Sequence, residues 1–88
     1  MEIDIVLRRY TIKTVQISLN SIGKVKSFVN AITQFDFDFD LISGRYVIDA
    51  KSIMGIFSLD LSKPIDLAIH TDDNIDEIME VLKPYLVE

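Results

Sequence analysis

The stretch that decides the fold is Phe35-Asp36-Phe37-Asp38-Phe39-Asp40-Leu41, in which apolar residues alternate strictly with aspartates. A period of two is that of a β-strand, where successive side chains point to opposite faces of the sheet. The pattern predicts a strand with one buried face and one polar face. Since the aspartate face must stay in water, all helices are expected to pack on the other face.

The three aspartates of this strand also raise the question of a cation site. Residues two apart on one strand lie nearly 7 Å apart, and that spacing is too wide for one ion to contact Asp36, Asp38 and Asp40 together. A solvated sheet face is the favoured interpretation, and no metal ligand is predicted.

A hairpin is predicted directly after this strand. Ser43-Gly44 supplies a tight turn, and the following residues, 45–49, have the composition of a second strand.

The segments before the aspartate strand predict two more strands and a helix. Acidic and aliphatic residues alternate over residues 2–7, and apolar residues recur at every second position over residues 12–19. Asn20 or Ser21 is a candidate N-cap for an amphipathic helix over residues 21–33, whose apolar side chains recur three and four apart.

The segments after the hairpin predict two helices and a further strand. A short helix is expected over roughly residues 52–59, and Ile65 to Ile69 alternate as a strand. Asp72 or Asp73 is expected to cap a last helix, with Pro84 distorting or ending its final turn.

This element order predicts an α+β fold of one domain over residues 1–88. We expect a two-layer open-faced sandwich, in which an antiparallel sheet of about four strands is covered on one face by three helices in the order β-α-β-β-α-β-α. Residues 1–11 are surplus to this plan and are expected to form an N-terminal extension or an added edge strand.

Composition limits the classes of function. A chain of 88 residues can build one modest core but no deep active-site cavity, so we expect neither an enzyme nor a bound cofactor. The net charge of −5 disfavours nucleic-acid binding. The absence of cysteine fits a reducing cytoplasm, and the acidic N-terminus resembles neither a signal peptide nor a membrane span.

The segment with the strongest functional signal runs from Lys51 to Leu59. Ser52 stands at a predicted helix N-cap, where its hydroxyl can accept a hydrogen bond from a backbone N–H group. Ile53, Met54 and Phe57 follow as an apolar stripe. We expect at least two of these three side chains to be exposed, with Ile56 and Leu59 pointing inward and Gly55 allowing close packing of the helix; the other interpretation is that the stripe belongs to the core.

The same segment closely resembles the regulatory-serine segment of HPr, the small phosphocarrier protein family of the bacterial sugar phosphotransferase system. The element order and the spacing of the neighbouring strands agree with that family from about Thr14 onward. The resemblance implies that an ATP-dependent kinase modifies Ser52. It also implies that Ile53, Met54 and Phe57 form the docking surface for that kinase and for a transcriptional regulator.

One departure from the family concerns the residue that carries the phosphoryl group. HPr proteins use a histidine within a Gly-x-His-Ala-Arg-Pro motif at the start of their first helix, whereas here the region is Leu19-Asn20-Ser21-Ile22-Gly23-Lys24. Counting back through the helix places Ser21 at the histidine position, although alignment on the first strand leaves that position empty. A serine phosphate ester has too low a transfer potential to serve the relay, so the resemblance favours a regulatory or adaptor protein, similar in logic to the catabolite-repression HPr homologues.

Two other classes of function stay open at this stage. One is a phosphocarrier that uses a non-standard residue, His70 or Ser21; for His70, no acidic partner is predicted nearby, and a surface position is the favoured interpretation. The other is a structural or oligomerising module, whose association the N-terminal strand could mediate.

Overall fold

The computed structural model describes residues 13–71 and 73–87. The predicted strand over residues 2–7 lies outside these ranges. The described elements, in chain order, are β1 (Lys13–Ile17), α2 (Ile22–Thr33), β2 (Phe39–Ser43), β3 (Tyr46–Asp49), α3 (Ile53–Phe57), β4 (Ile65–Ile69), α4 (Ile75–Leu82) and the 3₁₀ turn η1 (Lys83–Tyr85).

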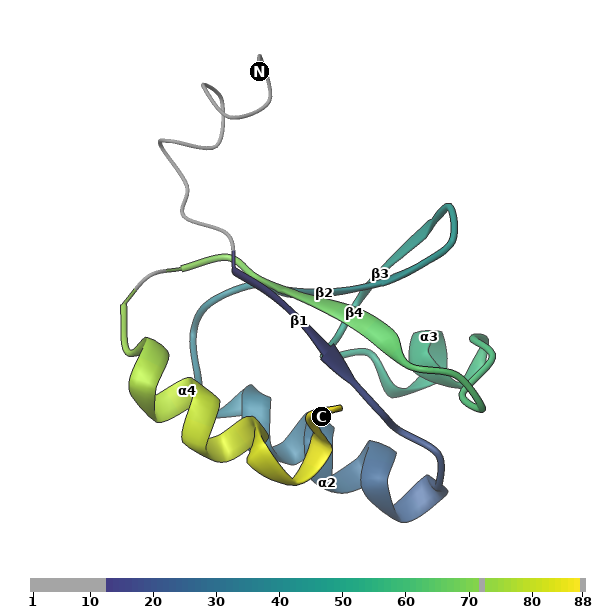
Figure 1. The fold of residues 1–88 in the computed structure, drawn as a ribbon, viewed down its shortest axis with the longest axis horizontal. Coiled ribbons are helices and arrows are strands. Elements are labelled where there is room, and N and C mark those ends of the chain that lie inside the picture. The colour runs from purple at the N-terminus through teal and green to yellow at the C-terminus, as the bar shows by residue number, and fades with distance from the viewer. Residues whose placement is uncertain (1–12, 72, 88) are drawn as a thin grey trace.

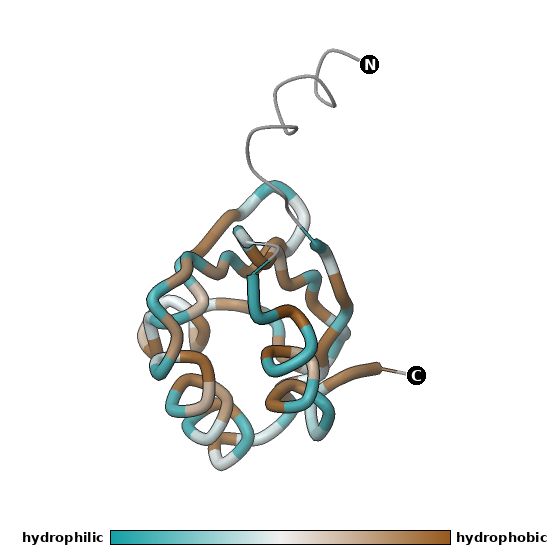
Figure 2. Tube along the Cα trace, turned by 90° about the vertical axis from the view of Figure 1, so that its left-hand side faces the viewer, coloured by the Kyte–Doolittle hydropathy of each residue, from teal (hydrophilic) through white to brown (hydrophobic). Residues whose placement is uncertain are grey.

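The four strands form one sheet in the order β1-β4-β2-β3, and each neighbouring pair is antiparallel. Figure 1 shows α2 and α4 side by side along one face of this sheet, with α3 near the end of β3. The view turned by 90° shows the same two layers, with hydrophobic and hydrophilic residues alternating along the chain (Figure 2). The predicted open-faced α+β sandwich is confirmed.

The core lies between the helix-facing side of the sheet and the helices. Alternate strand residues enter it, among them Ile17, Leu41 and Leu67, and all three are fully buried. The helices contribute Phe28 and Ile78, also fully buried. Burying a side chain of this size contributes about 1.5–3 kcal/mol. The sheet therefore turns its apolar residues toward the helices, as the alternation at residues 35–41 predicted.

The aspartate strand is shorter than the alternation predicted. It begins at Phe39 and not at Phe35, because the neighbouring strand β4 ends at Ile69, directly opposite Phe39. Phe35 is nevertheless buried, and its ring lies 6.3 Å from that of Phe39. The alternation therefore predicted burial correctly but placed the start of the strand four residues too early.

The hairpin turn is shifted by one residue from the prediction. Ser43 pairs with Tyr46, so the two-residue loop is Gly44-Arg45. Gly44 has a φ of +62°, a left-handed conformation that glycine adopts without the steric cost of a Cβ atom.

The helix boundaries agree with the sequence at α2 and differ at the two later helices. Ser21 caps α2 as predicted, whereas α3 covers only Ile53–Phe57 of the expected 52–59. The N-cap of α4 is Asn74, with a φ of +58°, and not Asp73; Asp72 lies outside the described residues. The α-helix ends at Leu82, and Pro84 lies in the 3₁₀ turn that follows. This agrees with the expectation that Pro84 distorts or ends the final turn of the helix.

Candidate functional site

Ser52 lies where β3 turns into α3. Its backbone is extended, with φ −97° and ψ 104°, and its Oγ accepts a hydrogen bond from the N–H group of Gly55 at 3.2 Å. The Ser52 N–H group donates to the carbonyl of Asp49 at 3.0 Å. The predicted N-cap is thus present, and the half-buried hydroxyl is held at the first turn of a short helix.

The close packing of α3 depends on Gly55. A Cβ atom placed there would lie 2.6 Å from Cγ2 of Ile48 and 3.2 Å from Oγ of Ser52. The glycine therefore lets α3 approach β3, as the sequence predicted.

Ile53, Met54 and Phe57 form an exposed surface, which we call the apolar patch. Their exposed fractions are 36%, 80% and 40%, whereas Ile56 on the opposite side of the helix is fully buried. Leu59 is half-buried and packs against the core. The expectation that at least two of the three patch residues are exposed is confirmed, since all three are.

The start of α2 lies beside the apolar patch. Ser21 is exposed and its Oγ accepts a hydrogen bond from the N–H group of Lys24 at 3.1 Å, the same cap geometry as at Ser52. A hollow of about 510 Å³ lies between the start of α2 and the end of α3. It is lined by Asn20, Ser21, Ile22, Phe57, Leu61 and Ser62. The structure therefore brings Ser21 and Phe57, which are 36 positions apart, to one surface feature.

Ile22 and Leu61 belong to this surface, and sequence reasoning missed both. The spacing of Ile22 fits the apolar stripe of the helix over residues 21–33, yet this side chain is 63% exposed. Its place in the first helical turn is the signal that could have separated it from the stripe.

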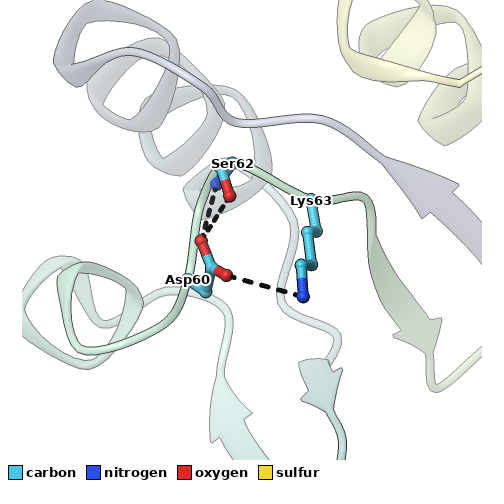
Figure 3. Close-up of polar contacts among 3 residues, drawn as sticks. All are labelled: Asp60, Ser62 and Lys63. Carbon is cyan, nitrogen blue, oxygen red and sulfur yellow. Dashed lines mark hydrogen bonds and ion pairs between the residues drawn. The ribbon is translucent and has the colours of Figure 1, made fainter.

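The loop that carries Leu61 and Ser62 is fixed by Asp60 (Figure 3). One oxygen of this carboxylate accepts bonds from the backbone N–H of Ser62 at 3.1 Å and from its hydroxyl at 2.6 Å, and the other lies 4.0 Å from Nζ of Lys63. The Ser62 hydroxyl is the main cause that lowers the pKa of Asp60 below its ordinary value, followed by the Ser62 backbone N–H. This turn positions one wall of the hollow.

Lys51 precedes Ser52 but its charge is engaged elsewhere. Its Nζ donates to the carbonyl of Phe35 at 2.7 Å and lies 5.7 Å from the centre of the Phe39 ring. The ammonium group thus joins the loop after α2 to the end of β3.

His70 has an acidic partner, contrary to the prediction. Its Nε2 lies 2.8 Å from Oδ2 of Asp40, and both side chains are half-buried. Phe39 and Ile69 lie opposite each other, and both are buried in the core. The residues that follow them in the chain, Asp40 and His70, therefore both point to the open face of the sheet. The pair lies at the end of β4 away from Ile65, whereas Ser21 follows β1 at the Ile65 end.

The three aspartates of the predicted strand lie in different surroundings. Asp36 and Asp38 are exposed, and Asp40 contacts His70. Within residues 13–71 and 73–87, no group of three or more His, Asp or Glu side chains is placed to hold a metal ion. In the same ranges, none of the helices has the length and apolar character needed to cross a membrane.

Comparison with known proteins supports the fold. No protein-family model and no curated protein matches the chain. Among solved structures, the crystal structure of HPr-C-His from Thermoanaerobacter tengcongensis matches with a TM-score of 0.67 and 25% sequence identity, over 82% of this chain and 88% of that chain. Together with the strand order and the three helices on one face, this similarity shows that the chain has an HPr-like fold.

Proposed function

We propose that this chain is an HPr-like regulatory or adaptor protein, which is controlled by phosphorylation of Ser52 and binds protein partners through the apolar patch. The observation that carries the proposal is the exposure of all three patch residues immediately after a capping serine. A small folded protein has little reason to leave adjacent apolar side chains in water unless another surface covers them.

Phosphorylation would change the surface while leaving the fold in place. A phosphoserine carries a charge of about −1.5 to −2 at neutral pH and three strong acceptor oxygens. Since Lys51 is engaged by the Phe35 carbonyl, the new charge would be available to an arginine of a partner. The partner would thus recognise an apolar surface bordered by an anion.

The same geometry argues against phosphoryl transfer through Ser21. A serine ester does not pass its phosphoryl group onward at the potential that a phosphohistidine does, and the chain's single histidine lies on the other end of the sheet. The hollow beside Phe57 instead supports a recognition surface around the apolar patch.

The proposal is tested by incubating the protein with an HPr-type serine kinase and ATP, and measuring the phosphoryl adduct by mass spectrometry. We expect labelling of the wild type and of Ser21→Ala, and none of Ser52→Ala. Ser21→Ala is a matched control because both serines cap a helix through one bond, at 3.1 and 3.2 Å, and each substitution should cost about 1 kcal/mol of stability. Equal labelling of all three proteins, or none of the wild type, would refute the proposal.

The role of the apolar patch is tested by Met54→Ser in the same assay. This side chain is 80% exposed, so its replacement should leave the fold unchanged. A lower rate of Ser52 labelling with unchanged thermal unfolding is the expected result. An unchanged rate would exclude the patch from kinase docking.

A second candidate function is phosphoryl carriage by His70, and the contact with Asp40 favours it. A carboxylate at hydrogen-bond distance fixes the orientation of an imidazole ring. Incubation with phosphoenolpyruvate and Enzyme I discriminates between the two candidates. An acid-labile adduct on the wild type that His70→Gln lacks would replace the regulatory proposal.

A further inference from the structure

The outer edge of β3 has properties of an unfilled strand-pairing site. β3 ends the strand order, so within the described residues no strand pairs with its outer side. Tyr46 and Val47 are each 64% exposed. Exposed edges are commonly protected by a short strand, by charged residues, by proline or by a bulge. β3 is short and ends in Asp49, but it contains neither lysine nor proline and pairs with β2 without a bulge.

The backbone groups that point outward can be identified from the ladder. The N–H group of Ala50 donates to the carbonyl of Phe39 at 2.8 Å, so these two residues form a hydrogen-bonded pair. Hydrogen-bonded and non-hydrogen-bonded pairs alternate along an antiparallel ladder. Val47 and Asp49 therefore direct their N–H and C=O groups away from β2, where the Asp49 carbonyl already accepts the N–H group of Ser52 and the Val47 groups face the free edge.

We propose that a second copy of this chain pairs with this edge in antiparallel orientation, about a twofold axis at Val47, and joins the two sheets into one. In this register Val47 exchanges two backbone hydrogen bonds with Val47 of the second copy. Tyr46 lies opposite Ile48 of the second copy, and Arg45 lies opposite its Asp49. Twofold symmetry produces the last two pairs twice.

Charge favours this register, because an axis at Tyr46 or at Ile48 would place no aspartate opposite Arg45. Centring the axis on Arg45 or on Asp49 would place two like charges directly opposite each other, which destabilises a strand pair. Centring it on Val47 places arginine opposite aspartate at both ends. Arg45 is exposed and has no ion-pair partner among residues 13–71 and 73–87, so it is available for this contact.

The apolar side chains fit the same arrangement. Ile42 lies opposite Val47 within the chain, and both point to the open face. Pairing at Val47 would produce a continuous apolar row across the joined sheet, formed by Ile42 and Val47 of one copy followed by Val47 and Ile42 of the other. Lateral contact between neighbouring side chains of this row supplies the hydrophobic part of the association.

The opposite edge of the sheet is less accessible. Leu86 forms a bridge with Ile17, and the N–H group of Val87 donates to the carbonyl of Gln16 at 3.0 Å. The C-terminal residues therefore cover part of β1. Pairing of β3 with β3 closes on itself and gives a dimer, whereas pairing of β3 with β1 would continue without limit.

Sedimentation equilibrium over a range of protein concentrations tests this proposal, with the variants Arg45→Asp and Asp49→Arg. The wild type should show a reversible monomer–dimer equilibrium, and each variant should raise the dissociation constant about tenfold by placing like charges opposite each other twice. An equimolar mixture of the two variants should form a heterodimer, because both cross-strand pairs then have opposite charges. The double variant should associate like the wild type.

The recovery of dimer formation in the mixture cannot arise from contacts within one chain. Positions 45 and 49 lie four residues apart on one strand, about 13 Å, so their side chains do not pair there. Circular dichroism of each variant reports the fold, because Asp49→Arg also removes the bond that the Lys51 N–H group donates to Asp49 Oδ1.

Three outcomes would overturn the proposal. These are a wild type that stays monomeric at every concentration, a mixture of the two variants that stays monomeric, and a dimer that neither variant weakens. Met54→Ser is the control for the apolar patch: if this variant abolishes the dimer while Arg45→Asp does not, the patch is the interface. None of these measurements involves phosphorylation of Ser52, so the two proposals fail independently.

Discussion

At the scale of single residues, Gly55 determines how Ser52 is presented. The helix that Ser52 caps touches β3 at this glycine, where any Cβ atom would lie within 2.6 Å of Ile48. Ile48 is branched at Cβ, so its Cγ2 atom cannot move away without rotating the whole side chain. The position of the capping bond from Gly55 to Ser52 thus depends on the absence of one methyl group.

Gly55→Ala should destabilise the protein by about 1–3 kcal/mol, the usual cost of forcing extra volume into a packed contact. Gly23→Ala is the matched control, since a Cβ atom there would meet nothing within 4 Å. Because alanine is the better helix former, Gly23→Ala should be neutral or stabilising by up to about 1 kcal/mol. Urea unfolding of both variants measures the difference, and equal effects would mean that α3 does not pack tightly on β3.

Residues differ in how far their surroundings could be predicted from the sequence. The Ser52 cap could be predicted because it depends on residues three positions apart. The contact between His70 and Asp40 could not, because it depends on which strand lies beside β2 and in what register. Leu61 and Ile22 likewise meet at the hollow only after the loop at Asp60 has folded against the start of α2.

At the scale of elements, the loop from Asp60 to Lys63 is held by polar contacts at Asp60 and by the packing of Leu61 against the core. Both hydrogen bonds from Ser62 end on one carboxylate oxygen, and the pKa of Asp60 is lowered as a result. A carboxylate whose pKa is lower in the folded state contributes stability above its unfolded pKa. This contribution is lost as the pH falls through the folded-state pKa.

Ser62→Ala should raise the pKa of Asp60 toward its ordinary value, because it removes the larger of the two hydrogen-bond effects while keeping the backbone N–H. Lys63→Met should raise this pKa less, since its ammonium lies 4.0 Å away and has the smallest effect. Carbon-detected NMR titration of the Asp60 carboxyl group measures both. A larger effect from Lys63→Met would show that charge, and not hydrogen bonding, controls this turn.

The type of each element could be predicted better than its ends. The period-two pattern at residues 35–41 identified the buried side chains, but a strand also needs a neighbour, and β4 provides none before Phe39. The N-cap of α4 is Asn74, which has a left-handed backbone. Residue type could not separate it from the aspartates before it, because asparagine and aspartate are nearly equal as N-caps.

At the scale of the whole molecule, the C-terminal residues tie β1 to α2. The carbonyl of Tyr85 accepts a bond from the N–H group of Ser18 at 2.8 Å, and its hydroxyl lies 2.6 Å from Oγ of Ser27. The Tyr85 ring also meets Phe28 edge-on, with 5.5 Å between centroids. Tyr85 thus connects the sheet edge through its carbonyl and α2 through its side chain.

A double-mutant cycle of Tyr85→Phe and Ser27→Ala measures this connection. Each single substitution should cost about 1 kcal/mol, since it removes one partly buried hydrogen bond. The double variant should cost less than the sum, because both changes remove the same bond. Additive losses in thermal unfolding would indicate that the two hydroxyls do not interact in solution.

The strand order has a consequence for how the chain folds. β4 lies between β1 and β2, so the centre of the sheet is supplied by the strand that the ribosome synthesises last. Until residues 65–69 are available, β1 has no partner among the described strands, and the β2–β3 hairpin is the one described strand pair that can form by local contacts. Pairing of β4 must therefore close two long loops, one to β1 and one to β2.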